Sequence, residues 1–141
     1  MVVYTVIPPF DERGNLPPGV HLAQWAEIRD RFGGNQWRCD LLDRIERVVR
    51  DLQRAGCRHV WLDGSFVTDK EFPGDFDLCY DLATTDLDVL DPVLLDRRTA
   101  KQIHGGDILP THPSLSFLDF FQMDRDGNTK GIVEIHLEGL R

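Results

Sequence analysis

Apolar residues in the first half of the chain recur every three or four positions, which is the spacing of one face of an α-helix. The longest such run covers residues 37–55 and stops at Gly56. Its apolar positions are Trp37, Leu41, Ile45, Val48 and Leu52. The same spacing predicts a shorter helix over residues 21–32, before a pair of glycines. A third helix is predicted over residues 91–103, which begin with an aspartate cap and a proline.

The rest of the chain contains apolar stretches of the length of β-strands. These are residues 58–63, 75–82, 116–123 and 131–137. The last two flank the turn-rich sequence DRDGNTK and are expected to form a hairpin. Residues 104–115 are expected to form a loop. The order of helices and strands predicts an α+β fold, in which helices cover a small mixed sheet of about four strands.

Length and composition fit one folded domain. We expect a single domain over residues 1–141, with a proline-rich, extended N-terminal arm at 1–20 and the core at 21–141. Apolar residues make up 41% of the chain and charged residues 28%, which suits both a core and a soluble surface. The net charge of −8 argues against an extended nucleic-acid surface, because such binding needs clustered positive charge.

Cysteine use and the N-terminal sequence predict a cytoplasmic protein. The three cysteines are an odd number without the spacing of a metal finger, which argues against a disulfide framework. The apolar run at residues 2–7 is too short to span a membrane and lacks the basic residue that precedes a secretory signal. We therefore expect no membrane partner.

Arginines of the helix predicted over residues 37–55 are spaced for pairing along the helix. Each of three acids precedes an arginine by four residues, the favourable orientation for such pairs. The pairs are Asp40 with Arg44, Asp43 with Arg47, and Glu46 with Arg50. This face is therefore expected to be solvated and self-paired rather than to bind nucleic acid.

The candidate chemistry lies in residues 62–77, LDGSFVTDKEFPGDFD. Asp75 and Asp77 open a predicted strand and, being two residues apart, project from the same face. Two carboxylates on one face supply hard oxygen ligands that suit Mg²⁺ or Mn²⁺ together with substrate phosphates. Asp63, at the end of the preceding strand, is expected to make local hydrogen bonds.

Residues between the two predicted strands are candidates for binding phosphates. Gly64 lets the backbone turn sharply and approach a ligand, and Ser65 offers a hydroxyl and an amide. Lys70 can place a point charge against the same phosphates, whereas Thr68 can only hydrogen-bond them. Together these four residues predict a site for a triphosphate group.

This stretch resembles the motif of the minimal nucleotidyltransferases of the DNA-polymerase-beta-like superfamily. The matching residues are Gly64, Ser65, Asp75, Phe76 and Asp77, with a nine-residue spacer after the serine. The close match covers residues 60–80, and the neighbouring helices and strands also follow that fold's order. The resemblance implies a nucleotidyltransferase-like fold, a nucleoside triphosphate donor and two divalent ions. It also implies transfer of a nucleotidyl group to a hydroxyl, with pyrophosphate as the leaving group.

The resemblance further implies a third carboxylate on a later strand, for which the sequence offers two candidates. Asp119 lies among apolar residues in SFLDFF, where a buried acid is costly unless it has a partner or ligand. It is the first candidate for the catalytic, metal-binding role. Glu134 in GIVEIHL is the alternative, although an exposed edge-strand position would also explain it. Many small nucleotidyltransferases carry an arginine shortly after the serine, where this chain has Thr68 and then Lys70.

These features predict a metal-dependent nucleotidyltransferase that modifies a hydroxyl on a partner protein or an RNA. Small members of the superfamily commonly act beside a partner encoded with them, some as antitoxins that nucleotidylate a toxin. The resemblance implies such an antitoxin-like role here. The alternative is a catalytically inactive module that keeps the fold and acts by binding a partner protein. The sequence leaves both open.

Overall fold

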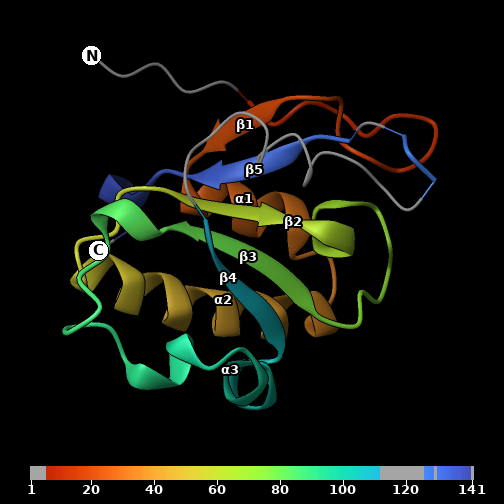
Figure 1. The fold of residues 1–141 in the computed structure, drawn as a ribbon. Helices are drawn as coiled ribbons and strands as arrows, with labels where there is room; N and C mark the ends of the chain where they lie inside the picture. Colours follow the sequence, from red (N-terminus) through yellow and green to blue (C-terminus); the bar gives the residue numbers. More distant parts are fainter. Residues whose placement is uncertain (1–5, 112–125, 129, 141) are drawn as a thin grey trace.

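The computed structural model describes residues 6–111, 126–128 and 130–140. Helices lie against a mixed sheet (Figure 1). The helices are α1 (Trp25–Phe32), α2 (Gln36–Arg54) and α3 (Arg97–His104). The strands are β1 (Val20–Ala23), β2 (Val60–Asp63), β3 (Phe76–Asp81), β4 (Gly106–Thr111) and β5 (Ile132–Ile135). The predicted α+β fold with a mixed sheet is confirmed, with five strands in the described part instead of about four.

The described sheet has the order β1-β5-β2-β3-β4. β2 runs antiparallel to both of its neighbours, whereas β1 with β5 and β3 with β4 are parallel pairs. Leu62, Leu78, Ile108 and Val133 share the main apolar core with residues of α1 and α2. Successive side chains of a strand point to opposite faces. Their sequence neighbours therefore point to the other face of the sheet.

α2 packs its apolar face against the sheet. Its buried apolar residues are Leu41, Leu42, Ile45, Val48, Val49 and Leu52. The helix begins after Asn35, whose side chain accepts a hydrogen bond from the Arg38 amide at 2.8 Å. It ends before Gly56, which has a φ of 86°, a conformation that favours glycine. The helix predicted over residues 37–55 from the apolar spacing and the terminal glycine is therefore confirmed.

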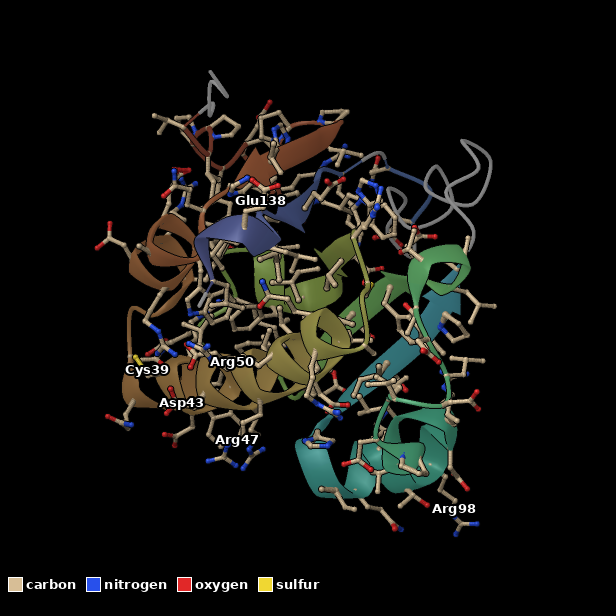
Figure 2. The ribbon with its side chains drawn as sticks, turned by 90° about the vertical axis from the view of Figure 1, so that its left-hand side faces the viewer. Cys39, Asp43, Arg47, Arg50, Arg98 and Glu138 are labelled. Carbon is tan, nitrogen blue, oxygen red and sulfur yellow. The ribbon has the colours of Figure 1, made fainter. Side chains whose placement is uncertain are left out.

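The polar face of α2 points toward solvent, as Asp43, Arg47 and Arg50 show in Figure 2. Among the described residues, only one of the three predicted pairs forms, with Arg50 Nε 3.3 Å from Glu46 Oε2. Asp43 pairs instead with Arg29 of α1, whose Nη2 lies 2.9 Å from Asp43 Oδ1. Contact between α1 and α2 thus competes with pairing along α2. Such exposed pairs contribute little to stability.

Two strands occupy positions where the sequence predicted other structure. Residues 20–23 form β1 rather than the start of a helix, because they pair with β5. Residues 106–111 form β4 rather than a loop, because they pair with β3. Both pairings join segments far apart in the chain, which local periodicity does not register. The strand predicted over residues 116–123, and hence its hairpin with β5, lies outside the described residues.

The helix predicted over residues 91–103 is divided in the structure. Pro92–Leu95 form a short 3-10 turn. α3 then begins after Asp96, whose carboxylate accepts a hydrogen bond from the Thr99 amide at 3.1 Å. It ends at His104, before Gly105, which has a φ of 79°. The division places α3 beside β4 at the edge of the described sheet.

The proline-rich N-terminal segment lies against the core. Residues 6–19 contain neither helix nor strand, in agreement with their predicted extended character. Ile7 and Leu16 are nevertheless buried in the main apolar cluster. The Leu16 carbonyl accepts a hydrogen bond from the Gly131 amide, just before β5. In the described part of the chain, no helix has the length and apolar character needed to cross a membrane.

Candidate functional site

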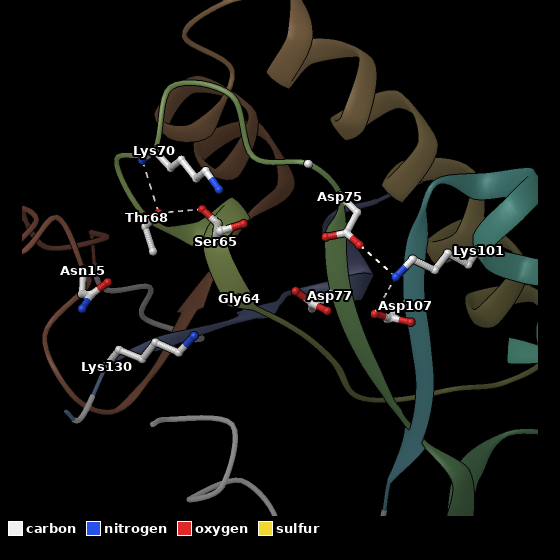
Figure 3. A pocket seen from close by; sticks show the side chains of 11 residues that line it. Asn15, Gly64, Ser65, Thr68, Lys70, Asp75, Asp77, Lys101, Asp107 and Lys130 are labelled. Atoms are coloured by element: carbon white, nitrogen blue, oxygen red, sulfur yellow. Dashed lines mark hydrogen bonds and ion pairs between the residues drawn. The ribbon is translucent and has the colours of Figure 1, made fainter. Parts of the chain in front are cut away.

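Three aspartates occupy neighbouring positions on three adjacent strands. Asp63 of β2 lies opposite Asp77 of β3, and Asp77 lies opposite Asp107 of β4. Register partners on adjacent strands project from the same face. The three carboxylates therefore form a row on the face of the sheet opposite α1 and α2. Asp75, immediately before β3, lies close to this row (Figure 3).

The chain bends sharply where β2 ends. Gly64 begins a 3-10 turn, Gly64–Val67, with a φ of 74°, a conformation that favours glycine. A Cβ atom at this position would collide with the carboxylate of Asp77. The missing side chain therefore allows the bend at Gly64 and Ser65 to approach the row of aspartates.

Arg38 of α2 fixes the loop that follows the bend. Its guanidinium is buried and donates hydrogen bonds to the carbonyls of Phe66 at 2.8 Å, Thr68 at 2.7 Å and Lys70 at 2.6 Å. It also donates to the Phe32 carbonyl at 3.2 Å. Burial lowers the pKa of Arg38, whereas the nearby charge of Asp69 raises it. This side chain ties the loop to α2.

A pocket of about 680 Å³ opens between the bend and the aspartates (Figure 3). Its lining residues are Asn15, Gly64, Ser65, Thr68, Lys70, Gly74, Asp75, Asp77, Lys101, Asp107 and Lys130. The carboxylates and the lysine ammonium groups thus share one cavity. This combination suits a ligand that brings both cations and phosphates. All the described residues that the sequence singled out for the site lie here, apart from Glu134.

Thr68 supports the bend from within the loop. Its Oγ1 donates a hydrogen bond to the Ser65 carbonyl at 2.6 Å and accepts one from the Lys70 amide at 3.2 Å. The hydroxyl proton of Thr68 is thus donated to another residue of the protein. Thr68 therefore shapes the bend at Gly64 and Ser65 more directly than it offers a donor to a ligand. Lys70 follows on the same loop and is exposed.

Lys101 of α3 bridges two of the aspartates (Figure 3). Its Nζ lies 3.2 Å from Asp75 Oδ2 and 3.3 Å from Asp107 Oδ2. Arg97, one turn earlier, places Nε 3.2 Å from Asp107 Oδ1. Hydrogen bonds to Asp75 and Asp107 raise the pKa of Lys101. Since half of the Lys101 side chain is exposed, water and salt weaken the bridge.

Burial and crowding raise the pKa values of the two innermost carboxyls. Burial, followed by the charge of Asp77, raises the pKa of Asp63 to about 7. Burial, followed by the charges of Asp75 and Asp107, raises the pKa of Asp77 to about 6. Asp63 Oδ1 is buried and has no hydrogen-bond partner among the described residues. Burial and the neighbouring carboxylates thus disfavour the charged forms of Asp63 and Asp77, and a bound cation would favour these forms.

Comparison with known protein families identifies the family of this chain. A model described as a family of unknown function, DUF6932, matches residues 8–136. The chain belongs to the DUF6932 family. No curated protein and no solved structure shows a significant match to it. The range shared with DUF6932 contains every residue that lines the pocket, from Asn15 to Lys130.

In this DUF6932 protein, the third described carboxylate that lines the pocket belongs to Asp107. The sequence did not indicate Asp107, because residues 104–115 were predicted to form a loop. A weak signal was present, since the acid directly precedes the apolar pair Ile108-Leu109. Pro110 argues against a strand in the sequence, because proline cannot donate a backbone hydrogen bond. A proline is nevertheless compatible with a strand at the edge of a sheet, where β4 lies.

The two carboxylates proposed from the sequence have different outcomes. Asp119 lies outside the described residues. Glu134 of β5 faces Trp61 of β2, and its Oε1 accepts a hydrogen bond from Trp61 Nε1 at 2.8 Å. Its Oε2 lies 3.3 Å from His59 Nδ1. The structure therefore places Glu134 in a polar contact on the sheet, away from the lining of the pocket.

The donor set at the pocket fits Mg²⁺ or Mn²⁺, provided that Lys101 moves. As the described side chains stand, no three from His, Cys, Asp and Glu surround one point as metal ligands. Asp75, Asp77 and Asp107 nevertheless supply hard carboxylate oxygens around a shared cavity. The raised pKa of Asp77 and the unpartnered oxygen of Asp63 fit a position where a cation binds. Displacement of Lys101 would free oxygens of Asp75 and Asp107 for the ion.

Proposed function

We propose that this protein is a metal-dependent nucleotidyltransferase that transfers a nucleotidyl group from a nucleoside triphosphate to a hydroxyl. The observation that carries the proposal is the convergence of Asp75, Asp77 and Asp107 with the bend at Gly64 and Ser65 in one pocket. Adjacent paired strands carry or flank these residues, so the sheet fixes their relative positions. The resemblance of the local motif to minimal nucleotidyltransferases supports the same assignment.

In the proposed site, the two sides of the pocket bind different parts of the ligand. On one side, the hydroxyl and amide of Ser65 and the ammonium of Lys70 bind the phosphates of the donor. Lys130, which the sequence did not single out, precedes β5 and lines the same pocket (Figure 3). On the other side, the aspartates hold cations. Thr68 contributes indirectly, because its hydrogen bond to the Ser65 carbonyl holds the bend in shape.

In the proposed reaction, the acceptor hydroxyl oxygen attacks the α-phosphorus of the donor. The bond from that phosphorus to the bridging oxygen breaks, pyrophosphate leaves, and the hydroxyl proton passes to solvent. Divalent ions, when bound, favour ionisation of the hydroxyl and offset charge on the departing pyrophosphate. Asp75, Asp77 and Asp107 hold these ions, and Asp77 is central because its strand pairs with those of Asp63 and Asp107.

The proposed acceptor is a partner protein or an RNA in the cytoplasm. All three cysteines are free, which suits a reducing compartment. The resemblance to small nucleotidyltransferases makes a toxin protein the first acceptor to test, with this chain in the role of the antitoxin. The described structure leaves the pocket open at its rim, with Lys70 and Gly74 exposed, so a large acceptor can approach it.

Label transfer tests the proposal directly. Each of the four α-labelled nucleoside triphosphates is incubated with Mg²⁺ or Mn²⁺, total protein and total RNA from the source cell. We expect the wild type to transfer label and the Asp75→Asn/Asp77→Asn variant to lose transfer while it keeps a cooperative melting transition. Asp30→Asn, on the exposed side of α1, is the matched control and should retain transfer. Equal labelling by the double variant and the wild type would refute the proposal.

A second candidate is a binding module that keeps the fold without catalysis. Lys101 favours this alternative, because its ammonium already neutralises Asp75 and Asp107. A ligand that binds the native state raises the melting temperature by mass action. A rise with any nucleoside triphosphate that requires millimolar Mg²⁺ would support the nucleotidyltransferase. No rise with any of the four would support the binding module.

A further inference from the structure

An exposed aromatic pair adjoins the proposed nucleotide pocket. Trp37 at the start of α2 is 49% exposed, and Phe72 in the loop before β3 is 57% exposed. Their rings pack edge to face, with centroids 6.2 Å apart and an angle of 85° between the planes. Trp25 and Trp61, by contrast, are 8% and 3% exposed. The exposure of Trp37 therefore distinguishes it from the other tryptophans of the chain.

Hydrogen bonds hold this aromatic pair in place. Trp37 Nε1 donates to the Pro73 carbonyl at 2.6 Å, and Asn35 Nδ2 donates to the Glu71 carbonyl at 2.9 Å. These bonds tie the residues on both sides of Phe72 to the start of α2. An aromatic surface that is ordered in advance loses little conformational entropy when a ligand binds.

A smaller hollow lies beside Trp37 of the aromatic pair. It has a volume of about 120 Å³ and is lined by Trp37, Asp40, Leu41, Arg44 and Gly74. Gly74 also lines the larger pocket, next to Asp75. A Cβ atom added at Gly74 would meet nothing within 4 Å, so the space around this residue is open. Gly74 therefore belongs to the linings of both hollows.

We propose that Trp37 and Phe72 bind the base of the donor nucleotide while its phosphates occupy the larger pocket. Stacking on aromatic rings accepts any base, because every base has a π-face. Asp40 can accept, and Arg44 can donate, hydrogen bonds at the edge of the base. The inference rests on the proposed function, since it extends the same triphosphate site. It assigns base recognition to the start of α2 and to the loop before β3.

Tryptophan fluorescence offers a direct test, because Trp37 is far more exposed than Trp25 and Trp61. With Mg²⁺ present, at least one of the four nucleoside triphosphates should quench wild-type fluorescence. Inorganic tripolyphosphate, which lacks a base, should not. Trp37→Phe should abolish the quenching.

Affinity measurements on Phe72 variants complete the test. Phe72→Ser should weaken binding of the quenching nucleotide about tenfold and leave tripolyphosphate affinity unchanged. Leu95→Ser, at a 50% exposed apolar residue that lines neither hollow, is the matched control and should change neither affinity. Melting without ligand checks that each variant folds.

The outcomes separate this inference from the function on which it rests. If nucleotides and tripolyphosphate bind equally well, without quenching and without an effect of Phe72→Ser, the base site is overturned and the phosphate site stands. If neither ligand binds in the presence of Mg²⁺, the proposed function fails, and the base site fails with it.

Discussion

Asp107 lies beside Asp77 in the parallel pairing of β4 with β3. This position depends on Gly106, which is paired with Phe76. A Cβ atom at residue 106 would come within 2.6 Å of the Phe76 ring, so only a residue without a side chain lets β4 approach at this point. Strand pairing, rather than the motif around Asp75, thus brings the third carboxylate into the pocket.

Replacement of Asp107 tests the identity of the third carboxylate. If the proposed function is correct, Asp107→Asn should lower nucleotidyl transfer by about two to three orders of magnitude, because in the proposed site the Asp107 carboxylate holds a cation at the reacting phosphate. The rate is measured with saturating nucleotide over a Mg²⁺ titration. A melting curve checks that the variant remains folded.

Glu134→Gln is the matched control for Asp107→Asn. Glutamine keeps an oxygen that accepts the hydrogen bond from Trp61, so this variant should retain activity. Asp119→Asn is measured beside it. Full activity of Asp107→Asn together with loss in either of the other variants would assign the third carboxylate to that other residue.

Lys101→Met should tighten binding of Mn²⁺ severalfold. The ammonium bridges Asp75 and Asp107, so in the proposed site a metal ion must displace it before the ion binds both carboxylates. The dissociation constant for Mn²⁺ is measured by electron paramagnetic resonance without nucleotide. Lys101→Arg preserves the charge and should bind Mn²⁺ as weakly as the wild type.

Lys130→Met separates direct competition from the general effect of one fewer positive charge. Lys130 lines the same pocket but forms no salt bridge with the carboxylates among the described residues. We expect it to affect Mn²⁺ binding less than Lys101→Met does. An equal effect of the two variants would contradict the displacement of Lys101 by the metal.

Asp63→Asn should stabilise the protein at alkaline pH in the presence of EDTA. The folded-state pKa of Asp63, about 7, lies above its ordinary value of 3.8, so the folded protein binds more protons between these values. Stability attributable to Asp63 therefore falls as pH rises through this window, by up to about 4 kcal/mol. Asparagine cannot ionise and avoids this loss. The melting temperature of Asp63→Asn should thus exceed that of the wild type at pH 8.

The pH dependence provides the control for Asp63→Asn. At pH 5 the Asp63 carboxyl of the folded wild type is mostly protonated, so the two proteins should melt at closer temperatures. If the variant is instead less stable than the wild type at pH 8, the Asp63 carboxylate is stabilised by a cationic partner and its pKa is not raised.

Arg38→Lys should destabilise the fold by about 3 kcal/mol. A planar guanidinium donates to several carbonyls of the 66–70 loop at once, whereas an ammonium cannot reach the same set, and buried carbonyls would lose their donors. Urea denaturation measures the change, and tripolyphosphate affinity reports the shape of the bend. Arg50→Lys, on the exposed face of α2, should match the wild type. Equal stability of Arg38→Lys and the wild type would show that the loop holds without this guanidinium.

The local parts of the site were predictable from the sequence because they depend on short-range geometry. Asp75 and Asp77 share a face because they are two residues apart on a strand, and Gly64 with Ser65 forms the bend because glycine tolerates the required φ. Helix α2 was predictable for the same reason, since its spacing and its terminal glycine lie within the segment itself.

Residues whose roles depend on distant partners were not predictable in this way. Arg38 lies among the polar residues at the start of α2, yet it is buried because the 66–70 loop folds over it. Lys101 meets Asp75 and Asp107 only because α3 packs beside β4. In each case the contact joins segments that no short sequence window contains.

The sequence by itself determined the two aspartates, the glycine-serine bend, the lysine after it and the long helix α2 that covers the sheet. The tertiary structure decided which strand lies beside β3, and hence that Asp107 and Lys101 enter the pocket while Glu134 pairs with Trp61. Turn and helix preferences arise from interactions between near neighbours, whereas strand pairing is selected by the packing of the whole chain.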